Sequence, residues 1–166
     1  IGKLRNLTGL DDFDLPTEAQ WEYACRAGES YMFCNGTWAP RDVGLYSGDA
    51  ASTGACHDVG ERNPNNWGIY DMHGNVTEAC LDHYSCDEDR EATFAPDWKD
   101  GGVTVDPKGR EDFMLNAGGV PLVVKRGGAW NMSWDHARAA SAYAHGSWYY
   151  ATDYNGFRLF RPAVAK

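Results

Sequence analysis

The chain has 166 residues, of which 43% are hydrophobic, and it is rich in Trp, Tyr and Gly, so it has the size and apolar content of one ordinary domain over residues 1–166. Its formal net charge of -9 argues against nucleic acid and anionic membranes as partners, because a phosphate-binding face needs clustered Lys and Arg. No apolar run approaches the length of a membrane span, so no membrane insertion is predicted, and the opening residue Ile1 leads us to expect further residues upstream.

Two helices are predicted near the start of the chain. Leucines recur at helical spacing and predict the end of a helix over residues 1–9. The segment LPTEAQWEYACRAG predicts a second helix, in which Thr17 and Gln20 form a capping box and Gly28 ends the helix. The apolar face of this second helix consists of Trp21, Ala24 and Cys25.

The middle of the chain has few signals of regular structure. Residues 29–64 are rich in Gly, Ser and Asp and predict long irregular chain with at most short strands. Gly74 and Asn75 predict a tight turn before a short strand, and Leu122 to Val124 is the most β-prone run. The acidic residues between positions 86 and 100 lack EF-hand spacing and are interpreted as solvated. The core candidates of the turn-rich segment are Trp67, Ile69 and Tyr70.

The five cysteines form no CxxC pair and no zinc-finger spacing. We interpret them mainly as free, buried thiols, while a disulfide between Cys34 and Cys56 or between Cys80 and Cys86 stays open as an alternative. The histidines, His73 among them, lack the spacing of metal ligands. Without a nucleophile elbow or a phosphate loop, the sequence has no place for hydrolytic or phosphoryl-transfer chemistry.

The segment from Arg126 to Arg161 has an unusual composition. Between Ala129 and Asn155 it contains no Leu, Ile, Val, Lys or Glu, and it combines Tyr and Trp with Ser, Ala, Asn, Asp, His and Gly. Tyr and Trp offer rigid, amphipathic contact area and small polar residues adapt their hydrogen bonds, as in antibody paratopes. The composition therefore predicts a recognition surface. A Tyr-rich strand pair packed in a core stays open as the alternative, although no strict alternation persists.

Four motifs occur in order along the chain: LPTEAQWEYACRAG, NNWGIYDMHGNVTE, VVKRGGAW and NGFRLFR. Together they resemble the formylglycine-generating enzyme family, also called sulfatase-modifying factors, over residues 14–161. The resemblance implies an α+β, C-type-lectin-like fold with small antiparallel sheets, few helices and much irregular loop. It also implies that an upstream portion of the family's domain is absent from this sequence.

Several residues of these motifs are expected to form a rigid framework. Gly127–Gly128 should permit a close backbone approach, and Gly156 should occupy a turn with positive φ. Trp130 and Phe157 are expected to be large apolar anchors, and Arg158 to be a structural, hydrogen-bonded arginine.

The resemblance also implies a structural Ca²⁺ at a turn. The family holds the ion around a GNxWE-type turn with carboxylate and carbonyl oxygens, which are the ligands that Ca²⁺ prefers. Thr77 and Ala79 stand where the family has tryptophans, so the local packing must differ, and solvated carboxylates are the alternative. The implied ligands are the Asp71 side chain, the Gly74 and Val76 carbonyls and the Glu78 carboxylate.

The oxidases of this family use two cysteines, which bind copper and attack the substrate thiol. The corresponding positions here are Met132 and Ala137, and an alanine has no ligand atom, so a thiolate pair for a soft metal cannot form. We therefore expect no copper and no catalysis. A formylglycine-generating or related sulfur-directed oxidase that acts with other residues is the alternative, and an accessory structural domain is a third.

The same fold occurs in the variable proteins of diversity-generating retroelements, in which adenine-directed mutagenesis rewrites a C-terminal segment that ends near a GFR motif. An AAC or AAT codon altered at its adenines can give Asn, Asp, Ser, Thr, Tyr, His, Gly or Ala, but never Lys, Glu or Gln. Residues 126–158 resemble such a segment, because most of the predicted contacts belong to this set. Framework residues 126–130, 138–140 and 156–159 should stay constant. We predict a non-catalytic module that binds an unknown protein or other surface ligand. The sequence leaves the localisation unknown, and binding of this kind would imply exposure on a cell surface or virion.

The predicted ligand contacts combine aromatic side chains with small polar ones and lie at both ends of the diversified segment. Trp134, Trp148 and Met132 fall outside the adenine-derived set and need other template codons or a fixed role. The predicted contacts are Asn131, Met132, Ser133, Trp134, Asp135, His136, Tyr143, His145, Ser147, Trp148, Tyr149, Tyr150, Asp153, Tyr154 and Asn155.

Overall fold

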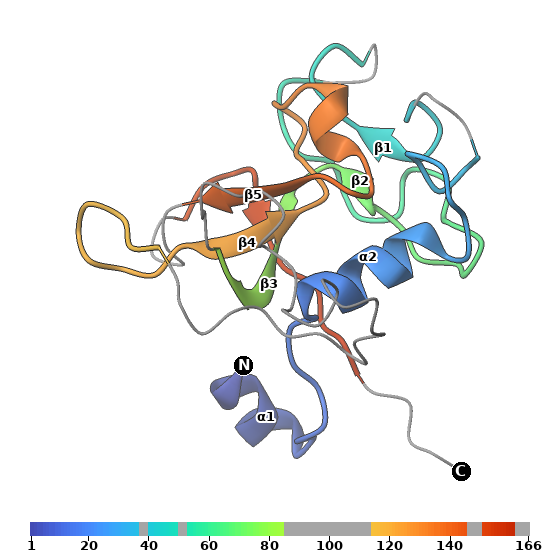
Figure 1. The fold of residues 1–166 in the computed structure, drawn as a ribbon. Coiled ribbons are helices and arrows are strands. Elements are labelled where there is room, and N and C mark those ends of the chain that lie inside the picture. The colour runs from blue at the N-terminus through green and yellow to red at the C-terminus, as the bar shows by residue number, and fades with distance from the viewer. Residues whose placement is uncertain (37–39, 50–52, 85–113, 146–150, 162–166) are drawn as a thin grey trace, which may run out of the picture.

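The computed structural model describes residues 1–36, 40–49, 53–84, 114–145 and 151–161 (Figure 1). The acidic residues between 86 and 100 and the predicted contacts from Ser147 to Tyr150 lie outside these ranges. No helix within the ranges has the length and apolar character that crossing a membrane requires. In chain order the elements are α1 (Gly2–Thr8), α2 (Glu18–Arg26), β1 (Gly44–Leu45), β2 (His73–Gly74), β3 (Thr77–His83), β4 (Val123–Arg126), the 3-10 helix η3 (Trp134–Ala137), β5 (Ala142–His145) and β6 (Asn155–Gly156).

Helix α2 lies against β3 and β4 and forms the main core with them (Figure 1). It begins as predicted, because the Thr17 hydroxyl accepts from the Gln20 backbone N–H and the Gln20 side chain accepts from Thr17. It ends one residue earlier than predicted, since Ala27 already adopts the left-handed conformation with φ 47°. The apolar face of the helix packs in the cluster of Trp21, Cys25, Met72, Cys80, Val124 and Ala139, with Ala24 partly buried beside it.

The larger sheet has the strand order β5-β4-β3-β6, and a second sheet consists of β1 and β2. The pairs β3–β4 and β4–β5 are antiparallel, as expected for this fold. In contrast, β6 runs parallel to β3 and β1 runs parallel to β2. A parallel pair needs a long connection, and the long irregular segments of this chain supply it. The architecture is therefore α+β, with few helices, small sheets and much irregular chain.

Two short strand pairs depend on glycine because the backbones approach very closely. A Cβ atom on Gly44 would lie 2.0 Å from the carbonyl oxygen of His73, so no larger residue fits in β1. A Cβ atom on Gly156 would lie 2.7 Å from the Val76 Cγ2 atom. Gly156 is not among the residues with positive φ, so the predicted positive-φ turn was wrong, and this close contact is the reason for glycine.

Helix α1 forms where the leucine spacing predicts it, but none of its residues is buried. Leu7, for example, is 75% exposed. The helix is attached by Arg5, whose Nη2 donates to the Asp14 carboxylate at 2.8 Å and whose Nε donates to the Phe13 carbonyl at 3.0 Å. The leucine pattern therefore marks a helix but no core contact within the described residues.

Two aromatic side chains predicted for the core lie on the surface instead. Trp67 is 48% exposed and Tyr70 is 44% exposed. Trp67 belongs to a turn that Asn65 closes, because the Asn65 Oδ1 accepts from the backbone N–H of Trp67 and of Ile69 at 3.0 Å. This turn leaves the indole outside, so only Ile69 of the three candidates packs against the core.

The cysteines are free thiols in the part of the chain that the structure describes. Cys25, Cys34 and Cys80 are buried and Cys56 is exposed. Neither of the two alternative disulfides forms, because Cys34, Cys56 and Cys80 are all free. Burial raises the pKa of Cys34 to about 11, so this thiol stays protonated near neutral pH.

Candidate functional site

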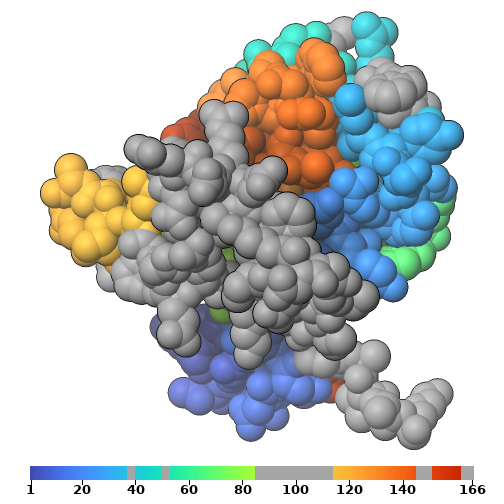
Figure 2. Space-filling model, in the orientation of Figure 1, coloured from blue at the N-terminus to red at the C-terminus, as the bar shows by residue number. Residues whose placement is uncertain are grey.

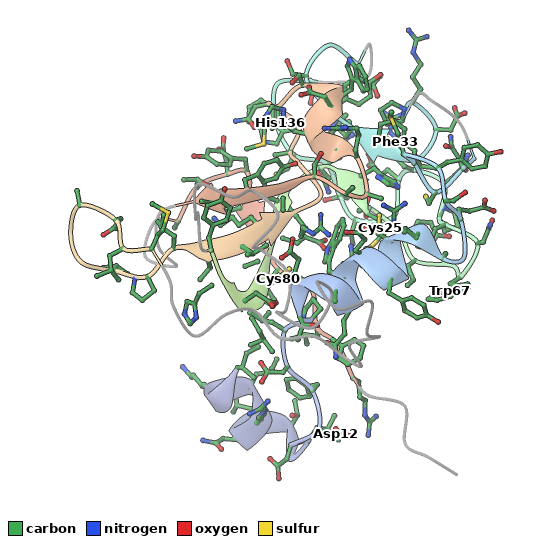
Figure 3. The ribbon with its side chains drawn as sticks, viewed as in Figure 1. Asp12, Cys25, Phe33, Trp67, Cys80 and His136 are labelled. Atoms are coloured by element: carbon green, nitrogen blue, oxygen red, sulfur yellow. The ribbon has the colours of Figure 1, made fainter. Side chains whose placement is uncertain are left out.

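Five predicted contacts form an exposed group on η3 and the turn before it. Figure 2 shows this segment in orange as a continuous part of the visible surface, and Figure 3 places His136 at that end of the molecule. Trp134 is 47% exposed, and its ring centroid lies 6.5 Å from that of Phe33. Met132, also a predicted contact, is half-buried. Asn131, Ser133 and Trp134 are exposed, and about half of the Asp135 and His136 side-chain surface is accessible. We name this group the η3 surface: Asn131, Ser133, Trp134, Asp135 and His136.

Hydrogen bonds hold the η3 surface in one arrangement. The Ser133 carbonyl accepts from the His136 backbone N–H at 3.0 Å. The Ser133 hydroxyl donates to the Asp135 carboxylate and lies 3.0 Å from Nδ1 of His136. The bond from Ser133 lowers the pKa of Asp135, so this side chain is a carboxylate near neutral pH. An indole, an imidazole and a carboxylate are thus presented side by side.

Ala137 anchors η3 from inside the protein. It is 1% exposed, and its carbonyl oxygen lies 2.7 Å from Nδ1 of His73. A Cβ atom on Gly128 would lie 3.0 Å from the Ala137 nitrogen, so the two backbones are in contact, as predicted for this glycine pair. Below the exposed side chains the base of η3 is therefore tightly packed, in a cluster of Phe33, Cys34, Val43 and Ala137.

His73 is fully buried and joins two distant segments at this base. Its Nε2 accepts from the Cys34 backbone N–H at 3.0 Å, and its Nδ1 therefore carries the proton that is donated to Ala137. Burial lowers the pKa of His73 to about 4, so the ring is neutral near neutral pH. The spacing of the histidines could not predict this role, because the two partners lie 39 and 64 residues away along the chain.

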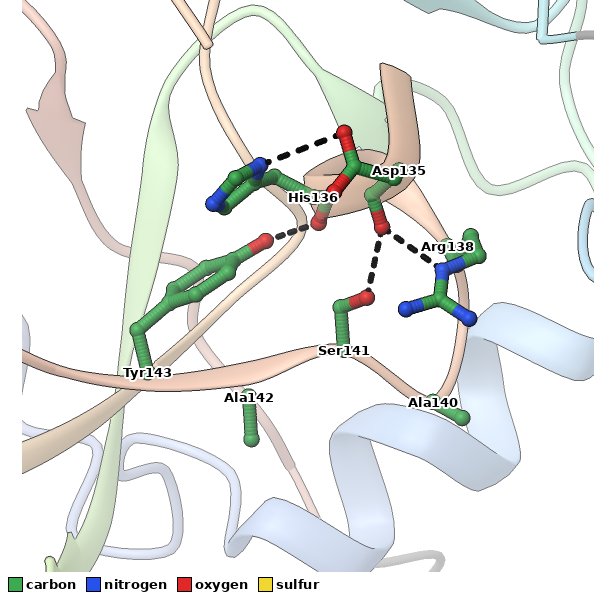
Figure 4. A pocket seen from close by; sticks show the side chains of 7 residues that line it. All are labelled: Asp135, His136, Arg138, Ala140, Ser141, Ala142 and Tyr143. Atoms are coloured by element: carbon green, nitrogen blue, oxygen red, sulfur yellow. Dashed lines mark hydrogen bonds and ion pairs between the residues drawn. The ribbon is translucent and has the colours of Figure 1, made fainter. Parts of the chain in front are cut away.

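A pocket of about 320 Å³ opens beside η3 (Figure 4). The Asp135 carbonyl accepts from Nε of Arg138 and from the Ser141 hydroxyl, both at 2.8 Å. The Tyr143 hydroxyl donates to the His136 carbonyl, and burial raises the pKa of Tyr143, so this proton is retained. The lining residues are Asp135, His136, Arg138, Ala140, Ser141, Ala142 and Tyr143.

The other predicted contacts are less uniformly exposed. Tyr143 on β5 and Tyr154 are half-buried, whereas Asp153 is exposed. The carbonyl of Tyr154 accepts from the Thr77 backbone N–H at 2.8 Å. His145 lies in β5, but its side chain is outside the described part of the structure. Among the predicted contacts with a described aromatic ring, Trp134 is therefore the most exposed.

Asn155, also a predicted ligand contact, is half-buried, and two neighbouring side chains donate to its side-chain oxygen. Its Oδ1 accepts from Nζ of Lys125 at 2.7 Å and from the Thr77 hydroxyl at 2.8 Å. Lys125 is 5% exposed, and burial lowers its pKa. This lysine was not a predicted site residue; the only sequence signal was that it directly follows two valines in the β-prone run.

The predicted framework is partly buried. Arg126, Ala129 and Ala139 are each 1% exposed, as expected for constant residues. Phe157 is 62% exposed, so its assignment as an apolar anchor was wrong; it follows β6, which is the edge strand of the sheet among the described residues. The prediction for Arg158 was correct, because its Nε and Nη2 donate to the two carboxylate oxygens of a buried glutamate at 2.6 and 2.7 Å.

In this structure the carboxylates of the implied Ca²⁺ turn accept hydrogen bonds from protein groups. Both oxygens of Glu78 bind Arg158, and one also accepts from the Trp21 indole N–H at 2.6 Å. Asp71 accepts from the Gly60 backbone N–H at 2.7 Å. No cluster of three or more metal-ligating side chains occurs in the described ranges. Calcium at Asp71, Gly74, Val76 and Glu78 stays a prediction, and in this structure Glu78 is paired with Arg158.

The sequence matches known proteins along its length. The model of the sulfatase-modifying factor enzyme 1-like domain matches residues 1–163. Chaperone protein LppX of Paenibacillus barcinonensis is 35% identical over 103 residues, which cover 52% of this chain and 37% of that protein. The formylglycine-generating enzyme of Thermomonospora curvata is 34% identical over 114 residues, 58% of this chain and 34% of the enzyme. The aligned part is thus about a third of either relative.

Solved structures show the same fold. Treponema denticola variable protein 1 is 27% identical, with a TM-score of 0.62, and covers 90% of this chain and 48% of its own. PvdO from Pseudomonas aeruginosa is 24% identical, with a TM-score of 0.72, and covers 95% of this chain and 55% of its own. The C-type-lectin-like architecture of the formylglycine-generating type is therefore confirmed, and the chain spans about half of these longer proteins.

Proposed function

Because the chain belongs to the sulfatase-modifying factor enzyme 1-like domain family, we propose that it is a non-catalytic member that binds a protein or other surface ligand through the η3 surface. The observation that carries this proposal is the division at η3. The side chains from Ser133 to His136 stand at the surface, while Ala137 directly after them is 1% exposed and packed on both sides. Such a division permits residues to vary above a base that does not move.

The residue types of the η3 surface support diversification. Asn131, Ser133, Asp135 and His136 all belong to the set that adenine-directed changes of an AAC or AAT codon produce. The structural likeness to a protein named variable protein 1 points in the same direction. Trp134 supplies a large, rigid contact area beside them, and aromatic side chains of this kind dominate binding energy at interfaces.

The absence of family catalysis is the second part of the proposal. At the positions of the family's cysteine pair, Met132 is half-buried and donates its backbone N–H to Ala129, and Ala137 fills an apolar cluster. Neither side chain offers a thiolate to copper. The match to a formylglycine-generating enzyme favours sulfur-directed oxidation as the alternative, in which other residues would have to act.

The test of binding compares two phage-displayed libraries, each selected on immobilised egg-white lysozyme as a defined protein target. One library varies the five residues of the η3 surface, and the other varies Arg126, Gly128, Ala129, Ala137 and Ala139. We expect the first library to retain protease-resistant display and to yield binders, and the second to lose the fold. Equal loss of folded clones in both libraries would contradict the division between surface and base.

Two further measurements address diversification and catalysis. We expect the source genome to contain, beside a reverse transcriptase gene, a near-copy of the DNA that encodes residues 126–158 and that differs from it only at adenines. If no such copy exists, the hypothesis of diversification by a retroelement is refuted. We also expect no Cu(I) uptake and no oxidation of a cysteine-bearing peptide. The Met132→Cys, Ala137→Cys double variant restores the thiol pair and serves as the control for copper uptake. Oxidation by the unaltered chain would establish the enzyme alternative.

A further inference from the structure

We propose that the pocket beside η3 is a carboxylate subsite, in which Arg138 holds an acidic group of the polypeptide that the η3 surface binds. This inference rests on the proposed function and names the chemistry of the partner. The pocket lies next to the exposed residues from Ser133 to His136, and two of them, Asp135 and His136, also line it (Figure 4). A ligand on the η3 surface therefore meets the pocket without any change of the backbone.

The guanidinium of Arg138 is oriented before a ligand arrives. Its Nε donates to the Asp135 carbonyl at 2.8 Å, and the Ser141 hydroxyl shares that acceptor. The neighbours of Arg138 in the chain, Ala137 and Ala139, are each 1% exposed, so its backbone is fixed on both sides. A side chain that is already ordered loses little further entropy when it binds, which favours affinity.

The two terminal nitrogens of Arg138 have no hydrogen bond or ion pair with any described residue. Arg126 and Arg158 differ in this respect, because each is paired with a glutamate. The planar fork of a guanidinium matches the two oxygens of a carboxylate, to which it donates two parallel hydrogen bonds. Arg138 thus presents the donors of such a pair, and the acceptor is what a ligand would supply.

The other polar groups of the pocket favour a singly charged anion. The Tyr143 hydroxyl proton and the Ser141 hydroxyl proton are already donated to carbonyls, so they do not compete for the ligand. Asp135 contributes a negative charge at the rim, and the chain as a whole carries a formal charge of -9. A doubly charged phosphate is repelled by these charges more strongly than a carboxylate.

Arg138 belongs to the predicted constant framework, whereas its neighbours on η3 belong to the predicted variable set. A constant arginine beside changing residues gives every variant the same anchor for one carboxylate. The residues of the η3 surface then decide which acidic polypeptide is bound. The subsite therefore selects acidic polypeptides as a class, and the variable residues select one polypeptide within that class.

The experiment follows the Nε–H resonance of Arg138 by NMR at constant ionic strength. Three probes are titrated: N-acetylglutamate amide, which has a side-chain acid; N-acetylglutamine, which has a terminal acid; and the neutral N-acetylglutamine amide. We expect the acids, and not the neutral amide, to shift the resonance with saturation. The acid that binds with the higher affinity shows whether the ligand's carboxylate belongs to a side chain or to a chain terminus. Equal shifts by the neutral amide, or no saturation by either acid, would overturn the subsite.

The matched variants are Arg138→Lys and Arg161→Lys, of which the second alters an exposed arginine paired with Asp12. We expect Arg138→Lys to weaken acid binding about tenfold to a hundredfold, because the fork is lost and the charge is kept. Binding to each variant is followed through the backbone resonances of residues 135–143, which also report whether the turn stays folded. Unchanged affinity in a folded Arg138→Lys variant would contradict the role of the fork.

Failure of this inference is separable from failure of the proposed function. If the η3 library yields folded binders while neither acid saturates the Arg138 resonance, only the carboxylate subsite falls. If the acids bind but no library member binds a protein target, the proposed function falls and the pocket remains an anion site.

Discussion

Acidification is expected to destabilise the protein through His73. The ring is fully buried, and its two nitrogens are used by Cys34 and Ala137, so the neutral form satisfies both partners. A proton on Nε2 would face the Cys34 N–H and abolish that hydrogen bond. Burial accordingly lowers the pKa of His73 to about 4, whereas the unfolded chain has the ordinary value of 6.5.

The sign of the effect follows from which state takes the proton first. As the pH falls below 6.5, the unfolded chain binds a proton on His73 and the folded chain does not, so stability declines until the pH reaches about 4. The difference between these pKa values corresponds to a loss of about 3 kcal/mol. Above pH 6.5 this contribution is fully present.

The assay is urea unfolding at intervals from pH 7 to pH 4 for the parent chain and for His73→Gln. Burial raises the pKa of Glu18, which counteracts the loss in the same range, so the difference between the two proteins isolates the histidine. We expect that difference to shrink by about 3 kcal/mol across the range. Parallel curves for the parent chain and His73→Gln would refute the reasoning.

Three further predictions concern the scaffold. Gly44→Ala should cost about 3 kcal/mol in urea unfolding, because its Cβ would lie 2.0 Å from a carbonyl oxygen of β2; Gly2→Ala, with open space around it, should cost nothing. Arg158→Met should cost about 3 kcal/mol because it leaves a buried carboxylate unpaired, whereas Arg161→Met, in an exposed pair, should cost less than about 1 kcal/mol; similar melting temperatures for these two variants would argue against the difference in burial. Calorimetric titration with CaCl₂ should show only weak binding, with a dissociation constant of about a millimolar or larger, since Glu78 is paired with Arg158; micromolar binding would show that the ion displaces Arg158.

Local features of the fold were predictable because neighbouring residues determine them. The capping box of α2 needs only Thr17 and Gln20, three positions apart, and both hydrogen bonds form. The close contact at Gly128 and the structural role of Arg158 were also expected from their motifs. Burial was predicted less well. Trp67, Tyr70 and Phe157 are large apolar residues, but their exposure depends on which elements happen to cover them.

The sequence by itself determined the family and the α+β architecture, because both depend on residue identity in ordered motifs; the same motifs predict that Met132 and Ala137 replace the cysteine pair. Only the tertiary structure decided what individual side chains contact. It placed His73 under Ala137, turned Asn155 inward onto Lys125, and left the terminal nitrogens of Arg138 without a partner in the described part of the chain. The physical reason is that a side chain's direction is set by groups far away in the sequence, which no local pattern records.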